Sequence, residues 1–588
     1  MPGFARTNLL IAMAAPICLL LFCSVSAQNS RAPVTQPASG GTRGPSSLLF
    51  SQDGLKLYVA EQDENAVAIL DPDGSTPPIH ISSGGEQPTA LALMPNGRTL
   101  LTANSFSGSV GVIDLEKRTL TGRLPLKGVP GDIAVAPNGR AFITVSQLDE
   151  VAVMDVAAMK IVARIPVGRR PRTLRFTPDN STLLCAGLGD GTLSVIDVAT
   201  QQERSRIKLP AINLRGLAVS ADGTHAYVTG QQPHNEKPTA DPLAMWSNLL
   251  CCVKLVGQTC SFERAIALDE QDRGAADPCG IALNNAGDTA YIALSGTHQA
   301  IVVPLRIAGN DPVRFPRIAV GANPRAVVAR PHSTQVWIGN HLGNSLSVVD
   351  ARDNTERRVG LNPPTPSPNR RLRGRFLFAD ARLARGNQFS CESCHPDGGT
   401  DGLSWKFSHV TDQPSVRNTR DLRGPLLLTG PYGWSAREQD FELFVNDEIM
   451  GLMRTHKLSH TDVHAFWDLI NETSQPPNPY RSATGKFTPS AERGMALFGG
   501  EAACIACHSG GQRGGGPSSA WVGTTPKGVK LDVPHLVGVH DTAPYLHDGR
   551  AKSLEDIFTT CDPGHAHGKA HLLSTAQRKD LLEYVREL

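Results

Sequence analysis

The sequence lacks a strong excess of charge of either sign. Its 588 residues include 57 Lys and Arg against 55 Asp and Glu, a formal net charge of +2 at pH 7. This balance argues against nucleic-acid or anionic-membrane binding, because both surfaces select basic proteins. Aromatic residues make up only 5%, whereas 56 Gly and 43 Pro are present. A chain of this length and composition is typical of several domains, with a turn-rich β domain beside an irregular helical one.

Long uncharged apolar runs are absent beyond the N-terminus, so nothing there predicts a membrane-spanning helix. The one apolar run, residues 9–23, follows Arg6 and precedes Val25-Ser26-Ala27, a small-x-small cleavage signal. Neither Cys18 nor Cys23 follows a small residue, as a lipid-anchored cysteine should. We interpret residues 1–27 as a signal peptide and 28–43 as an N-terminal segment, and we expect a periplasmic protein.

Two Cys-x-x-Cys-His pentapeptides are the most informative motifs in the chain: Cys391-Glu-Ser-Cys394-His395 and Cys504-Ile-Ala-Cys507-His508. In such a motif both thiols bond covalently to a haem, and the adjacent histidine becomes the proximal iron ligand. A zinc half-site or a redox dithiol is the alternative. One zinc tetrahedron needs its ligands close together, and these pairs lie in distant parts of the chain. We therefore predict two c-type haems, with His395 and His508 as proximal ligands.

Residues 44–361 repeat a unit of about 40 residues made of short strands and Asp-Gly or Asn-Gly turns. Two copies are Leu48-Leu-Phe-Ser-Gln-Asp-Gly54 and Leu91-Ala-Leu-Met-Pro-Asn-Gly97. Seven units of four strands predict a seven-bladed β-propeller, because a β-solenoid has shorter repeats. The units resemble the YVTN-type propeller repeats of secreted proteins. The prolines that open six of them are Pro45, Pro88, Pro130, Pro171, Pro278 and Pro324.

The fifth unit is interrupted between Gly230 and Gly280 by an insertion that holds four cysteines. In an exported loop these predict one or two disulfides at the edge of a blade, with a cysteine metal site as the alternative. Cys185, in an apolar strand pattern, is predicted to be a buried free thiol. The four cysteines are Cys251, Cys252, Cys260 and Cys279.

A proline-rich and then basic stretch, residues 362–373, predicts an extended linker between the two halves. Its arginines could instead dock an acidic electron donor. Beyond it, similar segments lead into the two haem motifs, which indicates an internal duplication. We expect two mainly α cytochrome-c-like lobes, at residues 374–486 and 487–588.

The haem half resembles the bacterial dihaem cytochrome c peroxidases and their MauG-type relatives. The resemblance rests on both haem motifs and on Thr542-Ala-Pro-Tyr-Leu-His-Asp-Gly-Arg550. It implies that Trp434 lies between the haems as an electron relay, with an ordinary core tryptophan as the alternative. It also implies that Glu448 is the acidic residue over the peroxide-binding haem.

The resemblance further implies a Ca2+ site at the junction of the lobes. Asn418, Thr542 and Pro544 match its ligands, and all three offer the oxygen atoms that a hard cation requires.

The sixth ligands of the two irons decide the chemistry, since peroxide activation needs an open position and electron storage needs two firm ligands. At the position where the family has Met or Tyr in the second lobe, this chain has Cys561, and His565 and His567 follow. We predict Cys561 or His567 as the distal ligand, because no methionine follows His508. For the first haem, His409 is the distal candidate.

These features predict a periplasmic dihaem c-type oxidoreductase that reduces hydrogen peroxide or uses it to oxidise a partner or substrate. The propeller is expected to orient a soluble electron donor or substrate protein across its top face. Two alternatives remain. One is an electron-transfer protein with two six-coordinate haems, and the other is a dehydrogenase that holds its substrate on the propeller and passes electrons to the haems.

Overall fold

The computed structural model describes residues 42–236, 245–271, 273–306, 314–361, 370–407, 415–428, 430–436, 438–482, 484–510 and 519–588. The predicted signal peptide, His409 and most of the predicted linker lie outside these residues. No described helix is long and apolar enough to cross a bilayer.

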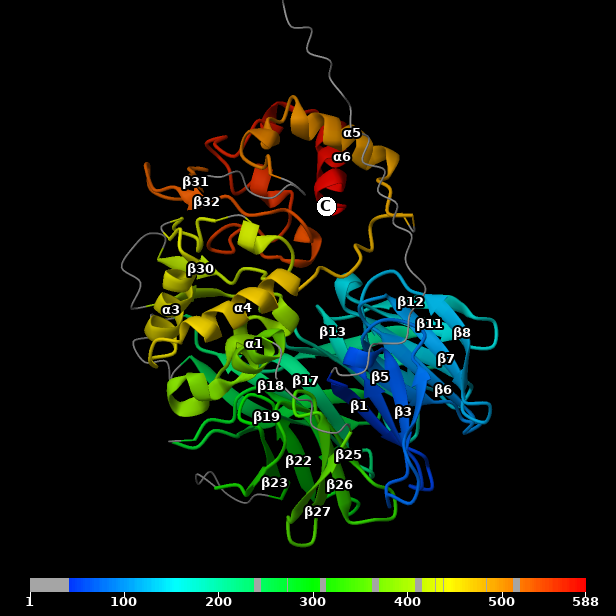
Figure 1. The fold of residues 1–588 in the computed structure, drawn as a ribbon. Coiled ribbons are helices and arrows are strands. Elements are labelled where there is room, and N and C mark those ends of the chain that lie inside the picture. The colour runs from blue at the N-terminus through cyan, green and yellow to red at the C-terminus, as the bar shows by residue number, and fades with distance from the viewer. Residues whose placement is uncertain are drawn as a thin grey trace, which may run out of the picture. The chain divides into compact units, whose positions relative to one another are not determined.

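The first half is a propeller of seven four-stranded antiparallel sheets within the described residues, as the repeats predict (Figure 1). Its first four blades consist of β1 Pro45–Phe50, β2 Leu57–Glu61, β3 Ala66–Leu70, β4 Ile79–Ser82; β5 Pro88–Leu93, β6 Thr99–Asn104, β7 Ser109–Asp114, β8 Thr119–Pro125; β9 Pro130–Val135, β10 Arg140–Val145, β11 Glu150–Asp155, β12 Lys160–Pro166; and β13 Pro171–Phe176, β14 Thr182–Gly187, β15 Thr192–Asp197, β16 Gln202–Lys208. The last three consist of β17 Ile212–Val219, β18 His225–Pro233, β19 Trp246–Val256, β20 Thr259–Ala267; β21 Pro278–Leu283, β22 Thr289–Leu294, β23 Gln299–Pro304, β24 Arg317–Ala319; and β25 Pro324–Ala329, β26 Gln335–Asn340, β27 Ser345–Asp350, β28 Glu356–Gly360.

The sequence of each blade accounts for its position in the propeller. Gly97 and Gly139 of the Asn-Gly turns have φ of 66° and 79°, a region that glycine enters without steric cost. The second strands are mostly buried, and β14 is buried along its whole length. The fourth strands, such as β16, alternate between exposed and half-buried residues because they form the outer edge.

The ring closes where the seventh blade packs on the first. Phe50 meets Trp337 edge to face, with ring centroids 5.9 Å apart. Arg330 reaches from the seventh blade to the carbonyl oxygen of Gly54 at 3.0 Å and to the carboxylate of Asp73 at 2.8 Å. Aromatic packing and a charge-assisted hydrogen bond therefore join the two ends of the repeat array.

The insertion in the fifth blade lengthens its strands, and the predicted disulfides are absent. Cys251 and Cys252 are neighbours on β19, so their side chains point to opposite faces of the sheet and enter different apolar clusters. Cys260 lies on β20 and Cys279 on β21, and all four thiols are free. They act as small apolar side chains between blades. Cys185 is a buried free thiol, as predicted.

The second half is mainly helical and irregular. Its α-helices and short strands are α1 Arg370–Ala379, α2 Cys391–Cys394, β29 Ser404–Lys406, β30 Val416–Asn418, α3 Phe441–Leu452, α4 His460–Glu472, α5 Pro489–Gly499, β31 Ser519–Ala520, β32 Leu531–Asp532 and α6 Thr575–Arg586. Side-chain oxygens cap the N-termini of α3, α4, α5 and α6 and satisfy backbone N–H groups that have no partner within the helix. These caps are Asp440, Ser459, Thr488 and Ser574.

The predicted duplication is visible in how one helix crosses another in each lobe. A Cβ on Gly374 of α1 would lie 2.1 Å from the carbonyl oxygen of Ala465 in α4, and a Cβ on Gly494 of α5 would lie 2.0 Å from that of Asp580 in α6. Only glycine permits such close crossings. The preceding arginines make matching ion pairs, Arg373 with Asp462 and Arg493 with Asp580.

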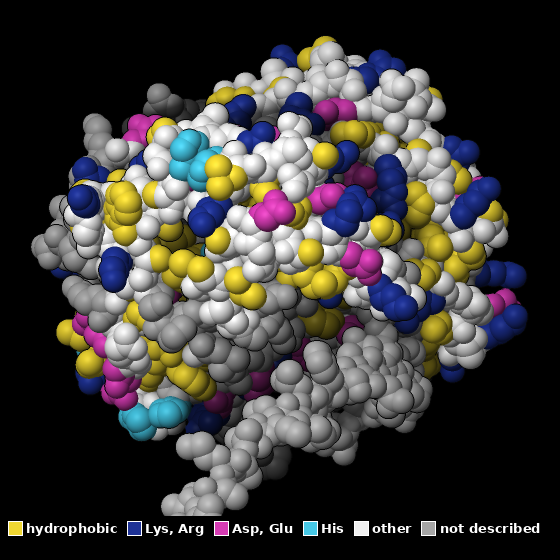
Figure 2. Space-filling view, turned by 90° about the horizontal axis from the view of Figure 1, so that it is seen from above, with side chains coloured by type: hydrophobic (Ala, Val, Ile, Leu, Met, Phe, Trp, Pro, Cys, Tyr) yellow, Lys and Arg dark blue, Asp and Glu magenta, His cyan; other side chains and the backbone are white. Residues whose placement is uncertain are grey.

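The prediction of an extended linker through residue 373 is wrong at its C-terminal end. Arg370, Arg371 and Arg373 belong to the first turn of α1. Their partners are acidic residues of α4: Asp468, Glu472 and Asp462. The face in Figure 2 shows basic and acidic side chains interspersed among apolar ones, in agreement with the small net charge.

The two crossings predict a selective effect of added methyl groups. We expect Gly374→Ala or Gly494→Ala to destabilise the protein by about 1–3 kcal/mol, because backbone must move to admit the Cβ. Gly499→Ala is the control, since a Cβ there meets nothing within 4 Å. Thermal unfolding followed by haem absorption measures the effect. Equal unfolding midpoints for Gly494→Ala and Gly499→Ala would contradict the close crossing.

Candidate dihaem centre

The first haem motif forms one helical turn, α2, whose sequence determines its own cap. The Ser390 hydroxyl accepts a hydrogen bond from the Glu392 N–H at 3.1 Å, and the Ser390 N–H donates to the Ser393 hydroxyl at 3.0 Å. His395 follows the helix, and its Nδ1 lies 3.1 Å from the carbonyl oxygen of Gly399. Nδ1 must carry the proton in that bond, which leaves the lone pair of Nε2 for an iron atom.

Side chains of the propeller form hydrogen bonds and an ion pair with this motif. Asp277, which is fully buried, accepts hydrogen bonds from the hydroxyls of Ser390 and Ser393, both at 2.6 Å. Asn213 donates to the carbonyl oxygen of Ser393 at 2.8 Å, and Arg325 pairs with the Glu392 carboxylate at 2.5 Å. Four contacts from three blades therefore fix the turn that carries both thiols.

The loop after His395 enters the centre of the propeller. Asp397 lines a cavity of about 150 Å³ together with Arg172, Arg215 and Arg325. Arg172 is 3.4 Å from the Asp397 carboxylate and holds its pKa well below the usual range. The chain's own haem lobe thus contacts the propeller at its central cavity.

A cavity of about 250 Å³ opens above the motif, and its composition suits a porphyrin. The thiols of Cys391 and Cys394 and the ring of His395 line it, and both thiols are free to form thioether bonds. Most of the remaining wall is apolar. Its larger side chains are Phe378, Phe389, Trp405, Phe407, Leu426, Leu427, Tyr432, Phe441, Phe444, Ile449, Met453 and Phe466.

Trp434 and Glu448 both line this cavity, and their predicted roles as electron relay and acidic residue over the haem stay predictions. The Trp434 indole donates to the carbonyl oxygen of Asn418 at 2.7 Å, and the guanidinium of Arg420 lies 5.2 Å from its ring. Met453, buried at the C-terminal end of α3, lines the same cavity and was missed as a ligand candidate for the first haem. His409 lies outside the described residues.

The second motif repeats the geometry of the first. Cys504–Ala506 form a short 3-10 turn, and Nδ1 of His508 lies 3.1 Å from the carbonyl oxygen of Pro534. Phe498 of α5 lies 6.5 Å from the His508 ring, as Phe378 of α1 lies 6.4 Å from His395. Each lobe therefore presents a proximal histidine that is oriented by a backbone carbonyl.

Of the distal candidates for the second haem, the structure places His567 beside His508. Burial lowers the pKa of His508 to about 4, and the charge of nearby His567 contributes to the same effect. The His567 backbone N–H donates to Asp562 at 3.1 Å, and its buried Nδ1 has no hydrogen-bond partner among the described residues. By contrast, exposed His565 stacks on His571 at 4.1 Å, and the Cys561 thiol contacts the Thr560 hydroxyl.

Two of the three calcium candidates meet at the junction of the lobes. The Asn418 amide nitrogen is 2.5 Å from the carbonyl oxygen of Pro544, while its amide oxygen is buried and unpartnered within the described residues. Rotation of the amide would direct two oxygens at one point, an arrangement that suits Ca2+. The Thr542 hydroxyl donates to the carbonyl oxygen of Val539, and a role for the Thr542 backbone oxygen as a Ca2+ ligand stays a prediction.

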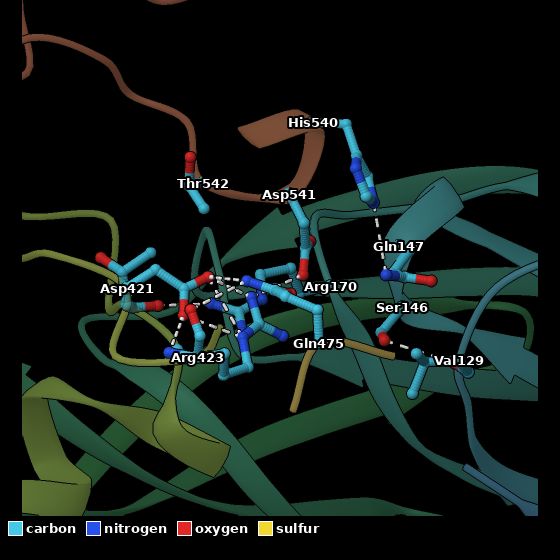
Figure 3. Close-up of polar contacts among 12 residues, drawn as sticks. Val129, Ser146, Gln147, Arg170, Asp421, Arg423, Gln475, His540, Asp541 and Thr542 are labelled. Atoms are coloured by element: carbon cyan, nitrogen blue, oxygen red, sulfur yellow. Dashed lines mark hydrogen bonds and ion pairs between the residues drawn. The ribbon is translucent and has the colours of Figure 1, made fainter. Parts of the chain in front are cut away.

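An ion network beside this junction links both lobes with the propeller (Figure 3). Arg423 of the first lobe binds Asp421 at 2.6 Å and Asp541 of the second lobe at 3.2 Å. Burial alone would raise the pKa of Asp421, but Arg423 outweighs it and lowers that pKa. His540 contacts Gln147 of the third blade at 3.3 Å. Ion pairs therefore join the two lobes here, and the contact of His540 with Gln147 joins the second lobe to the propeller.

The motifs predict the haem content directly. Denatured protein, matured with a c-type haem system, should retain two covalent haems, and Cys394→Ala or Cys507→Ala should leave one. Haem staining after denaturing electrophoresis, together with metal analysis, measures this. Zinc without haem would contradict the assignment of both motifs.

The geometry of the second lobe predicts which distal variant changes the spectrum. We expect His567→Ala to convert the second ferric haem from low spin toward high spin, because it removes an imidazole ligand. Cys561→Ala and His565→Ala are matched controls and should leave the spectrum as it is. A methionine-to-iron charge-transfer band in the near infrared that survives His567→Ala and Cys561→Ala would contradict the assignment.

The lobe junction predicts a response to calcium. Chelation should slow electron transfer between the haems, and Ca2+ should restore it, whereas Asn418→Ala should be insensitive to both. Reduction of each haem followed by stopped-flow absorption measures the effect. Unchanged kinetics, together with elemental analysis that finds no calcium, would contradict the prediction of a Ca2+ site at this junction.

Known proteins resemble parts of this chain, although no family model matches it. Hydrazine synthase subunit gamma of Kuenenia stuttgartiensis is 26% identical over 276 residues, covering 37% of this chain and 76% of that protein. Cytochrome c551 peroxidase of Nitrosomonas europaea is 24% identical over 239 residues, covering 32% and 71%. Methylamine utilization protein MauG of Methylorubrum extorquens is 24% identical over 294 residues, covering 39% and 79%.

Among solved structures, Kuenenia stuttgartiensis hydrazine synthase has a TM-score of 0.49 at 23% identity, covering 54% of this chain and 98% of that chain. The relatives by sequence agree with the haem motifs and the two matched lobes. The chain therefore joins a seven-bladed β-propeller to a region homologous to the dihaem cytochrome c peroxidases and MauG, both c-type haem oxidoreductases.

Proposed function

We propose that the protein is a periplasmic dihaem oxidoreductase in which hydrogen peroxide is the oxidant at the first lobe. The observation that carries this proposal is the difference between the two lobes. The first cavity presents a carboxyl side chain, Glu448, in the wall shared with His395, whereas the second lobe presents His567 beside His508. One lobe is suited to an exchangeable oxidant and the other to a six-coordinate electron store.

His395, Cys391 and Cys394 would hold the first haem, and His508, His567, Cys504 and Cys507 the second. When bound, a haem supplies an iron that exchanges electrons with the oxidant and with its neighbour. The described residues supply the rest. Glu448 moves the protons that reduction of peroxide to two waters requires, and the apolar wall excludes competing water. The carbonyls of Gly399 and Pro534 keep both proximal rings oriented.

The reducing equivalents come from a soluble periplasmic donor or from a substrate protein that the haems oxidise. The predicted N-terminal signal peptide supports a periplasmic location, where c-type haem is attached. Ca2+ at Asn418 and Pro544 would stabilise the junction across which electrons pass between the lobes.

A second function, electron transfer without catalysis, is favoured by one observation. Met453 is buried in the wall of the first cavity, and a thioether there is a possible sixth ligand for that haem. A ferric protein with two low-spin haems that does not consume peroxide would select this function.

The peroxidase proposal predicts a specific loss in one carboxyl variant. Glu448→Gln should lower kcat/KM for peroxide by about 10²–10⁴, the usual effect of removing an acid-base group. Glu442→Gln is the matched control, because Glu442 lies on the same helix and contacts exposed His460 at 2.7 Å. Steady-state peroxide consumption with a reduced one-electron donor measures both. Equal rates in the two variants would remove Glu448 from the mechanism.

A further inference from the structure

A second tryptophan of the first cavity has the environment of a redox-active residue. Trp405, on β29, is fully buried and lines the cavity together with Cys394 and His395. Its indole N–H donates to a carboxylate oxygen of Asp401 at 3.0 Å. An indole that loses an electron becomes a strong acid at nitrogen, so a carboxylate at this distance is positioned to receive the proton.

Asp401 is fixed by the haem motif itself. Its backbone N–H donates to the carbonyl oxygen of Cys394 at 2.9 Å, and its other carboxylate oxygen accepts from the Leu403 N–H at 2.9 Å. The side chain is fully buried, and burial raises its pKa to about 7, although Arg170 opposes this. Withdrawal from water thus makes this carboxylate a better base than an exposed one.

The environment of Trp434 disfavours the loss of an electron and a proton from its indole. Its N–H donates to a peptide carbonyl, which accepts a hydrogen bond but is a very weak base. The guanidinium of Arg420 lies 5.2 Å from its ring, although Asp532 offsets part of that charge. A cation over the ring stabilises the closed-shell indole and opposes a second positive charge on it.

A third ring connects Trp405 with the propeller. Trp246, at the start of β19, is fully buried, and its centroid lies 5.1 Å from that of Trp405. The next residue, Ser247, contacts the exposed side chain of His234. Two indoles in contact therefore lead from the first haem cavity toward the outside of the fifth blade.

We propose that Trp405, with Asp401 as its proton acceptor, is the tryptophan that donates an electron to the oxidised first haem site. This inference rests on the proposed function, in which hydrogen peroxide takes up two electrons and two protons and becomes two waters. The dihaem centre would supply one of these electrons and Trp405 the other. One electron leaves the Trp405 indole, its N–H bond breaks, and an O–H bond forms on Asp401. The product is a neutral indolyl radical beside a carboxylic acid. A later electron from the donor or substrate, by way of Trp246, returns the proton to nitrogen.

Freeze-quench electron paramagnetic resonance of the dihaem protein mixed with hydrogen peroxide tests the proposal. The expected result is an organic radical signal that narrows when the protein carries ring-deuterated tryptophan. Trp405→Phe should abolish it and Trp434→Phe should retain it. Asp401→Asn, which keeps the side-chain volume, should lower the radical yield by roughly tenfold or more. Haem content and haem absorption are recorded for every variant.

The outcomes separate this inference from the function on which it rests. If peroxide leaves the haem absorption of the wild-type protein unchanged, both are wrong. If the haem absorption changes but the radical is absent, or persists in Trp405→Phe, the function stands and the role of Trp405 is overturned. The radical could also disappear in Trp434→Phe and persist in Asp401→Asn. That result would assign the relay to Trp434 and would overturn the role of Trp405.

Discussion

The buried carboxylate of Asp277 is the interaction on which the rest of the structure depends. It accepts two hydroxyl hydrogen bonds from the turn that carries Cys391 and Cys394. A carboxylate away from water is costly unless such donors surround it. The propeller and the first haem lobe therefore share one interior, with Ile212, Met245 and Trp246 of the propeller in the same apolar cluster as Phe389 and Trp405. The propeller therefore supports the first haem motif, while the cavity itself is lined by residues of the second half.

The two lobes share one architecture but differ in the side chains around their proximal histidines. Both cross a helix pair at a glycine, place a phenylalanine near the proximal histidine and orient that histidine with a carbonyl. They differ in the other side chains that surround each predicted haem. The first has tryptophans and Glu448, and the second has His567, whose backbone is held by Asp562. Duplication thus preserved haem attachment, while the distal surroundings diverged.

The sequence allowed the propeller and the haem motifs to be predicted because their signals are local. Asn-Gly turns, alternating strands and Cys-x-x-Cys-His spacing each depend on a few adjacent residues. The free cysteines of the fifth blade were not predicted, because composition does not show that the insertion extends strands and directs Cys251 and Cys252 to opposite faces. The roles of Asp277 and Trp246 depend on contacts between distant segments, for which the sequence carries no signal. Asp401 and Trp405 are close in sequence, but only burial beside the haem motif distinguishes them.

The central claim is that the two haems have unlike surroundings, one open to an oxidant and one closed by two imidazoles. Electron paramagnetic resonance of the resting ferric protein tests it most directly. We predict one axial high-spin signal from the first lobe and one low-spin signal typical of paired imidazoles from the second, in equal amounts. Two low-spin signals, one of them from a methionine-ligated haem, would contradict the account and identify the protein as an electron carrier.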